Sequence, residues 1–238
     1  MGRLAVVGGN SILGTSFAAD AMRVDVGVAG TNVALLDAGD HVVLQRHGLD
    51  GYRVASAIDH RAHLLALAEQ HCDRIIALAS VGSLRRDLPV GSFVAPDDFI
   101  ALHLGVAIAQ DAGAHQVPGF DAGWRQTVLD SWAEQADVPL VDGGVYWHAL
   151  GPRFETPAEI RLMAQHADVV GMTLAAECIL ARELGIAYAA VCVVDNLANG
   201  IADRHLTVAE FETGKIANQH ALLGALADVV PALAKRAA

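Results

Sequence analysis

The sequence predicts an α/β fold in which helices flank a central mixed β-sheet. Three observations support it: short apolar runs of strand length, helical patterns between several of them, and the lack of an internal boundary. The runs are bounded by Gly, Asp or Pro and have the continuous apolar character of buried strands. Because no repeat, low-complexity tract or Pro/Gly/Ser linker divides the 238 residues, we expect residues 1–238 to form a single domain.

The predicted strands and helices alternate along the chain. The strand-like runs are Leu4–Val7, His41–Leu44, Arg74–Leu78, Gly91–Ala95, Asp168–Gly171 and Ala187–Val194. The helical segments are Ala62–Gln70, Trp124–Ala136, Pro157–Gln165, Leu174–Leu184 and Thr207–Lys235. Thr207 and Glu210 form a capping-box pair at the start of the last helix. The mixed stretch Ala101–Gly123 is expected to be an irregular loop.

The charge balance excludes two classes of partner. The chain carries 16 basic and 27 acidic residues, a formal net charge of −11. Such a surface repels nucleic acids and anionic membranes over most of its area, so we expect neither as a partner. A ligand that contains phosphate would therefore need a local niche of N–H groups or a buried cation.

The cysteines and the N-terminus favour a cytoplasmic protein. Cys72, Cys178 and Cys192 are far apart, odd in number and embedded in apolar runs, which predicts buried thiols. The N-terminus lacks the pattern of a signal peptide, and no apolar run is long enough to span a bilayer. The 11 histidines show no metal-ligand spacing, so no metal site is expected.

The most informative segment is Gly151–Glu177, GPRFETPAEIRLMAQHADVVGMTLAAE. Phe154 and Glu155 stand side by side before a predicted helix. An aromatic ring can cover the face of a planar heterocycle while a carboxylate accepts hydrogen bonds from its ring N–H groups. Thr173, at a strand-to-helix turn, could offer a hydroxyl and a backbone N–H to an anion. The segment therefore predicts two walls of one small-molecule pocket suited to a nucleobase.

Further candidates follow the ends of predicted strands, where open α/β sheets leave room for ligands. The turn Gly8–Gly14, GGNSILG, lets backbone N–H groups approach a phosphate. Arg46 follows HVVLQ, and its guanidinium suits a bidentate phosphate contact. Ser80 follows RIIALA and could donate a backbone N–H. Asp195 ends AYAAVCVVD, where a buried carboxylate is costly without a partner.

Several motifs in this order resemble one enzyme family. GPRFETPAEIR, then ADVVGMT with an acid four residues beyond the Thr, RHG and VGSLRRDLPVGSFVAPDDFI resemble the trimeric purine nucleoside phosphorylase and methylthioadenosine phosphorylase family. The similarity covers nearly the whole chain. It implies phosphorolysis of a purine (5′-methylthio)nucleoside to free purine and (methylthio)ribose-1-phosphate, with inorganic phosphate as co-substrate and no cofactor. It also implies a homo-oligomer, either a trimer or a dimer of trimers, with neighbouring subunits completing the site.

The resemblance also assigns roles to individual residues. The residues it implies for phosphate are Asn10, Arg46, His47, Ser80 and Thr173; for the purine, Phe154, Glu155, Asp195 and Asn196; for the ribose, Met172 and Val208. Asp195, protonated or paired with Asn196, is the candidate catalytic residue that assists N7 of the leaving purine.

The substrate within this family stays open. An ionised Asp195 only accepts hydrogen bonds and favours a 6-amino group, whereas Glu155 suits the N1–H of a 6-oxopurine and Asn196 could supply a donor. An apolar Val208 near the sugar 5′ position favours a methylthio group over a hydroxyl.

Four alternatives remain beside this interpretation. The enzyme could be a purine nucleoside phosphorylase acting on inosine, guanosine or adenosine. The chain departs from the family pattern at Asn10, at Leu49–Arg53 and at Ala79, so it could instead be a phosphate-independent nucleosidase or a non-catalytic nucleoside binder. GGNSILG also resembles a degenerate dinucleotide turn of a nicotinamide-dependent oxidoreductase, although that class leaves GPRFET unexplained.

Overall fold

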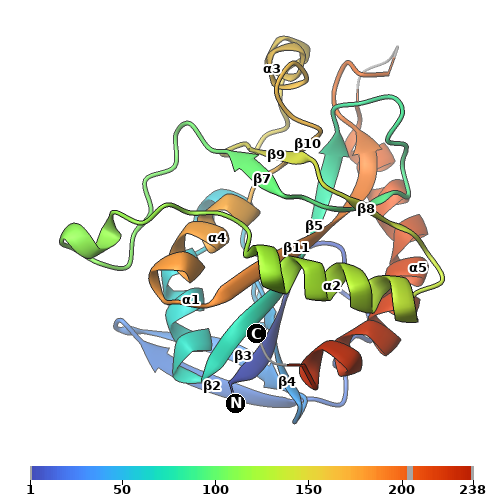
Figure 1. Cartoon of the computed structure of the whole chain (residues 1–238). Helices are drawn as coiled ribbons and strands as arrows, with labels where there is room; N and C mark the ends of the chain where they lie inside the picture. The colour runs from blue at the N-terminus through green and yellow to red at the C-terminus, as the bar shows by residue number, and fades with distance from the viewer. Residues whose placement is uncertain (1, 203–205, 237–238) are drawn as a thin grey trace.

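A computed structural model shows a large mixed β-sheet with helices on both faces (Figure 1). The structure describes residues 2–202 and 206–236. In these residues eleven strands belong to one sheet: β1 (Arg3–Gly8), β2 (Met22–Val28), β3 (Thr31–Asp37), β4 (His41–Gln45), β5 (Cys72–Ser83), β6 (Phe93–Ala95), β7 (Asp98–Ile100), β8 (Leu140–Asp142), β9 (Val145–His148), β10 (Val169–Gly171) and β11 (Ala187–Leu197). The α/β fold class predicted from the sequence is confirmed.

The helices of the described residues agree with the predicted segments. They are α1 (His60–Glu69), α2 (Ala122–Gln135), α3 (Pro157–Met163), α4 (Leu174–Glu183) and α5 (Val208–Ala234), with short 3-10 turns at Ala55–Ala57 and Ala112–Ala114. The capping box of Thr207 and Glu210 is present at the start of α5. The three cysteines are buried and unpaired, as predicted. No helix of the described residues is both long enough and apolar enough to cross a membrane.

The strands that sequence patterns did not predict are short or belong to the hairpin at one end of the sheet. β2 and β3 form this antiparallel hairpin, and the second half of β2 alternates between exposed and buried residues because only one of its faces packs on the core. β7 and β8 have three residues each and β9 has four. Such short strands show no recognisable periodicity and form because a neighbouring strand supplies their hydrogen bonds.

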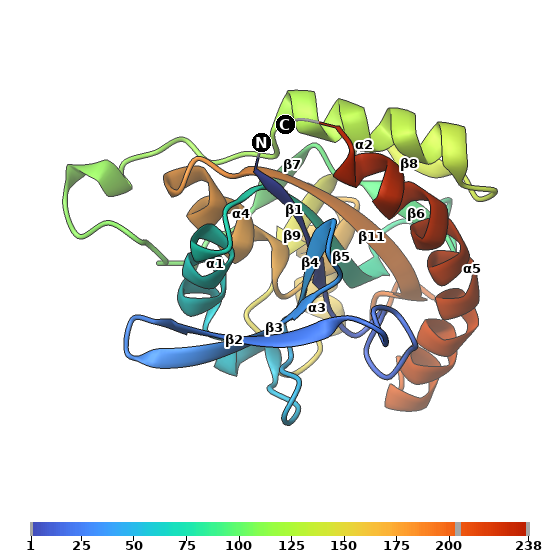
Figure 2. The same cartoon turned by 90° about the horizontal axis from the view of Figure 1, so that it is seen from below.

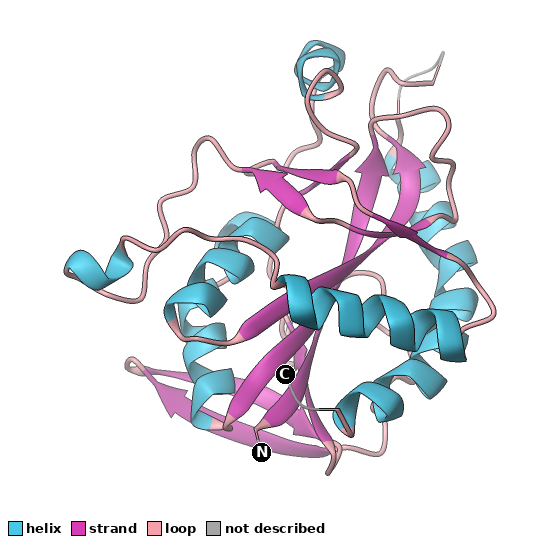
Figure 3. Cartoon of the chain, in the orientation of Figure 1, coloured by secondary structure: helices cyan, strands magenta, loops and turns pink. Residues whose placement is uncertain are grey.

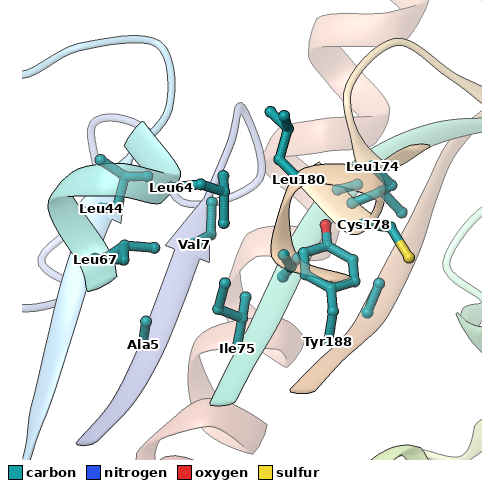
Figure 4. Close-up of a cluster of buried hydrophobic side chains, with 14 of the residues drawn as sticks. Ala5, Val7, Leu44, Leu64, Leu67, Ile75, Leu174, Cys178, Leu180 and Tyr188 are labelled. Carbon is teal, nitrogen blue, oxygen red and sulfur yellow. The ribbon is translucent and has the colours of Figure 1, made fainter. Parts of the chain in front are cut away.

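Two hydrophobic layers pack against opposite faces of the sheet. Along β1, Ala5 and Val7 belong to the cluster covered by α1 and α4, while Leu4 and Val6 belong to the cluster covered by α2 and α5. Figure 2 shows the two helix pairs on either side of β1, β5 and β11. Figure 4 shows the α1 and α4 side, where side chains from both helices meet those of the strands.

The direction of the central strands determines where a ligand can bind. β1 pairs in parallel with β4 and β5, and β5 pairs in parallel with β11, so these four strands end at the same edge of the sheet (Figure 3). β10 pairs antiparallel with the end of β5 and brings the turn after Gly171 to that edge. Clefts at the carboxyl ends of parallel strands are the usual ligand sites of such sheets.

Helix α5 packs very closely against the end of β11. A Cβ atom at Gly214 would lie 1.8 Å from the carbonyl oxygen of Asp195, so only glycine fits there without a shift of the backbone. At Gly224, in the same helix, a Cβ would have no atom within 4 Å.

These two glycines provide a matched test of the contact. Gly214→Ala should lower the free energy of unfolding by about 1–3 kcal/mol, because the added methyl group overpacks the α5–β11 contact. Gly224→Ala should raise it by up to about 1 kcal/mol, because alanine favours the helix. Urea unfolding followed by circular dichroism measures both values. If the two variants were equally stable, the close contact would not exist.

Candidate active site

One cavity at the carboxyl edge of the parallel strands gathers most of the residues predicted from the sequence. Among its lining residues are Asn10, Arg46, His47, Ser80, Phe154, Glu155, Met172, Thr173 and Asn196. They come from the ends of β1, β4, β5, β10 and β11 and from the loop before α3. Two predicted residues, Asp195 and Val208, do not line this cavity.

The turn after β1 lies directly against Arg46. A Cβ at Gly9 would lie 2.5 Å from Arg46 Nη1, so glycine is required where the two segments meet. The backbone N–H of Arg46 donates to the Gly8 carbonyl at 2.9 Å, which holds the two strand ends together. Asn10 follows this turn and lines the cavity.

Arg46 is 1% exposed and is held on three sides. Its Nε and Nη2 donate to the two carboxylate oxygens of Glu177 at 2.7 and 2.9 Å. Nη1 donates to the Leu78 carbonyl at 2.5 Å, and Nη2 also reaches the Val7 carbonyl at 3.4 Å. Glu177 therefore occupies the Nε and Nη2 donors in this structure, and the bidentate contact of Arg46 with phosphate stays a prediction. Arg46 lines the cavity, and its Nη1 lies beside Gly9, which lines it too.

His47 contributes a neutral ring to the same end of the cavity. Burial lowers the pKa of His47 to about 4. Its Nδ1 lies 2.8 Å from the Arg53 carbonyl, which can only accept, so Nδ1 carries the hydrogen and Nε2 is an acceptor. The ring stacks on Tyr52 with centroids 4.9 Å apart. His47 can therefore accept a hydrogen bond from a protonated phosphate oxygen or from a hydroxyl.

Thr173 stands at the N-cap of α4 and makes no side-chain capping bond to that helix. Its backbone N–H, expected to be free for an anion, donates instead to the Tyr146 hydroxyl at 3.1 Å. Its side chain and Met172 line the cavity. Asp50, from the stretch after RHG, points away from the cavity and pairs with Arg23, with Nη2 to Oδ2 2.8 Å.

The other end of the cavity combines an aromatic ring, a carboxylate and an amide. Phe154 is 39% exposed and meets Phe211 of α5 edge to face, with ring centroids 5.6 Å apart. Glu155 is 8% exposed, and burial raises its pKa. Its carbonyl accepts a hydrogen bond from Asn199 at 2.9 Å, which ties this loop to the exit of β11. Asn196 completes this end of the cavity.

Asp195 lines a second cavity and not the first, so its role as the base-binding catalytic residue stays a prediction. The register of β11 against β5 shifts between Val194 and Asn196, so Asp195 lies at a bulge and its neighbour takes the cavity position. The second cavity is lined by Asp195 together with residues of α5 such as Glu210 and Thr213.

The Asp195 carboxyl group is buried beside Ser80 and Asn218. Burial raises its pKa, and the neighbouring Ser80 hydroxyl and Asn218 amide oppose that rise. Asn218 Nδ2 donates to its Oδ1 at 2.8 Å. Its Oδ2 and the Ser80 hydroxyl complete no hydrogen bond of standard geometry within residues 2–202 and 206–236.

Some residues of the cavity carry no signal in the sequence. Val208 is 66% exposed at the start of α5, and Phe211, one turn later, lines the cavity instead. Leu206 and Tyr52 also line it. A phenylalanine in an amphipathic helix resembles core packing, so only the tertiary structure reveals its position. Over the described parts of the chain, no three His, Cys, Asp or Glu side chains are grouped as they would be to bind a metal ion.

Comparison with known proteins identifies the family. Residues 4–231 match the family model described as "Phosphorylase superfamily". An Archaeoglobus fulgidus protein named "Probable 6-oxopurine nucleoside phosphorylase" is 35% identical over 211 residues, 87% of each chain. A Methanosarcina acetivorans protein named "Probable S-methyl-5′-thioinosine phosphorylase" is 36% identical over 177 residues, which are 71% of this chain and 66% of the relative.

A solved structure of methylthioadenosine phosphorylase from Schistosoma mansoni in complex with adenine has the same fold. Its TM-score is 0.85 at 23% sequence identity, and the match covers 100% of this chain and 93% of the other. The fold and the family match together identify the chain as a protein of the nucleoside phosphorylase class. The chain belongs to the phosphorylase superfamily.

Buried histidines make the stability of this region sensitive to pH. His63 and His148 are 5% and 8% exposed, and burial lowers the pKa of each to about 4, as it does for His47. The Nδ1 atoms of His63 and His148 have no hydrogen-bond partner among the described residues. Protonation of either ring would thus place an uncompensated charge in the interior.

We predict that the protein loses stability as the pH falls from 6.5 toward 4. The unfolded chain binds protons at histidine near pH 6.5, whereas the folded state resists them, so each ring contributes on the order of 3 kcal/mol at pH 7 that is lost near pH 4. Urea unfolding at several pH values measures the slope of the free energy of unfolding against pH. His63→Gln should flatten the slope; an identical slope in the variant and the wild type would refute the assignment.

Proposed function

We propose that this protein catalyses the phosphate-dependent cleavage of 6-oxopurine nucleosides, with 5′-methylthioinosine preferred over inosine. The observation that carries the proposal is that Glu155 and Asn196 face the same cavity as Phe154 and Arg46, while Asp195 faces another one. The products are a free purine and a ribose-1-phosphate or its methylthio analogue.

The polar pair at the base end suits a 6-oxopurine. An ionised Glu155 accepts the N1–H of hypoxanthine, a hydrogen that adenine lacks, and the Asn196 amide donates to O6 or N7. Phe154 and Phe211 supply faces for the planar ring. A cavity with these groups discriminates against adenine, because its N1 lone pair would meet the carboxylate.

Phosphorolysis requires the anion to lie next to the sugar. The C1′–N9 bond breaks with its electron pair moving to the purine, and a phosphate oxygen forms the new bond to C1′ of an oxocarbenium-like ribosyl group. Arg46 Nη1, the Thr173 hydroxyl, Asn10 and the backbone near Ser80 are the donors that would hold phosphate. A donor from Asn196 at N7 stabilises the charge that builds up on the departing base.

The remaining walls of the cavity favour an apolar 5′ substituent. Val54 and Leu206 also line it, and their side chains offer no hydrogen bond to a 5′-hydroxyl. A hydroxyl that loses its water there without a partner binds poorly, whereas a methylthio group gains apolar contact. The relative from Methanosarcina acetivorans, named for S-methyl-5′-thioinosine, supports this choice.

A steady-state assay with and without phosphate tests the reaction and its specificity. We expect base release only with phosphate, kcat/KM about tenfold or more higher for methylthioinosine than for inosine, and about 100-fold lower values for the adenine analogues. Release of base without phosphate would instead favour a nucleosidase, the alternative that Ala79 suggests because it offers no side-chain donor.

Two neighbouring variants separate the two candidate base contacts. Asn196→Asp should lower kcat/KM for methylthioinosine by about 100-fold and shift the preference toward methylthioadenosine, because the carboxylate cannot donate. Asp195→Asn should leave the ratio between the two substrates unchanged. A shift in the ratio for Asp195→Asn but not for Asn196→Asp would reverse the assignment.

We also infer a homo-oligomer, because an apolar groove adjoins the cavity. Leu102, Leu150 and Leu162 line this groove and are 67%, 53% and 53% exposed, and Glu155 borders both spaces. A second copy of the chain would remove these side chains from water, as closed homo-oligomers commonly do.

The molar mass in solution tests this inference. Light scattering should give a molar mass of about three times 24.9 kDa, and Leu150→Asp should lower that mass because it places a charge in the subunit contact. A monomeric wild type would contradict this inference.

A further inference from the structure

A buried carboxylate outside the cavity is bonded to Arg46, the one arginine of the described residues that lines it. Glu177 is 1% exposed and lies one turn into α4 from Thr173. Besides Arg46, it accepts a hydrogen bond from the Tyr188 hydroxyl at 2.7 Å, and His60 Nδ1 lies 3.6 Å from its Oε1. Figure 4 shows the Tyr188 hydroxyl directed from β11 toward α4. The carboxylate is thus surrounded by donors on both oxygens.

We infer that Glu177 is a positioning residue that sets both the direction and the effective charge of Arg46 toward the anion. This role rests on the proposed function, in which Arg46 binds phosphate. Residues 46 and 177 lie 131 positions apart in the chain, and their pair joins the end of β4 to α4. The same helix therefore presents Thr173 to the cavity and fixes the cation beside it.

The hydrogen bonds of Arg46 determine what remains for a ligand. A guanidinium has five N–H groups, and four contacts, two to Glu177 and one each to Leu78 and Val7, account for four of them among the described residues. The fifth belongs to Nη1, the atom that lies against Gly9 at the cavity wall. Arg46 thus offers a single directed N–H to an anion.

The ion pair also removes most of the net charge at this end of the cavity. Burial alone would raise the pKa of Glu177, but Arg46 and His60 hold it well below its usual range, so the carboxylate stays ionised. His47 is neutral near pH 7 because burial lowers its pKa to about 4. Phosphate would then be held by directed N–H and O–H groups, with little net positive charge nearby. The bound ground state is therefore not stabilised more than the transition state in which phosphate attacks C1′.

Isosteric removal of the carboxylate charge tests this role. Glu177→Gln keeps the shape of the side chain but leaves Arg46 uncompensated, so inorganic phosphate becomes its nearest counterion. We expect titration calorimetry of the full chain with phosphate to give a Kd lower by about tenfold or more. KM for phosphate should fall in parallel while kcat does not rise, because tighter ground-state binding does not accelerate the chemical step.

A remote variant makes the same chemical change. Asp73→Asn turns a carboxylate beside the buried Arg74 into an amide, in a pair that does not line the cavity. Its Kd for phosphate should stay within about twofold of the wild-type value. Circular dichroism at the titration temperature shows that each variant is folded.

The outcomes separate this inference from the proposed function. An unchanged or weaker phosphate affinity in Glu177→Gln, with a wild type that binds phosphate, would overturn the role of Glu177 alone. A wild type that binds no phosphate and releases no base with it would overturn the proposed function, and this role with it.

A second variant decides the case if Glu177→Gln does not fold. Glu177→Asp keeps the charge but is too short to bridge both Nε and Nη2. It should lower kcat by about tenfold, with the Kd for phosphate within about threefold of wild type. An unchanged kcat would overturn the positioning role.

Discussion

The parallel pairing of β4, β1, β5 and β11 is the constraint on which the site depends. Four strands that run in one direction must end at one edge of the sheet, whatever the length of chain between them. Each carries small or polar residues in its last positions or directly after its end, so Asn10, Arg46, Ser80 and Asn196 meet there without any local relationship in sequence. The helices on both faces bury the strands and leave this edge as the place for a ligand.

The buried pair of Arg46 and Glu177 gives the site its chemical character. An arginine that is 1% exposed cannot remain unpaired, because an isolated charge in the interior is very costly. Its carboxylate partner relieves that cost and at the same time occupies Nε and Nη2, two donors that would otherwise be available to an anion. In this chain, with a net charge of −11, the proposed binding of phosphate relies on local donors instead of a positive surface.

Much of this arrangement could be predicted from the sequence, because strand ends and motif residues carry visible signals. Arg46 follows an apolar strand, and the Phe154–Glu155 pair precedes a capped helix, so sequence signals alone predict that both lie at the ligand site. That Asn196 and not Asp195 lines the cavity could not be predicted, since a one-residue bulge reverses which side chain faces it. Phe211 could not be predicted either, because a packed helix and a cavity wall have the same apolar pattern.

A crystal structure with phosphate and hypoxanthine bound tests the central claim most directly. The account predicts one cavity with phosphate about 2.7–3.2 Å from Arg46 Nη1 and the purine between Glu155 and Asn196 at similar distances. A purine in the cavity of Asp195, or a phosphate that makes no contact with Arg46, would contradict it.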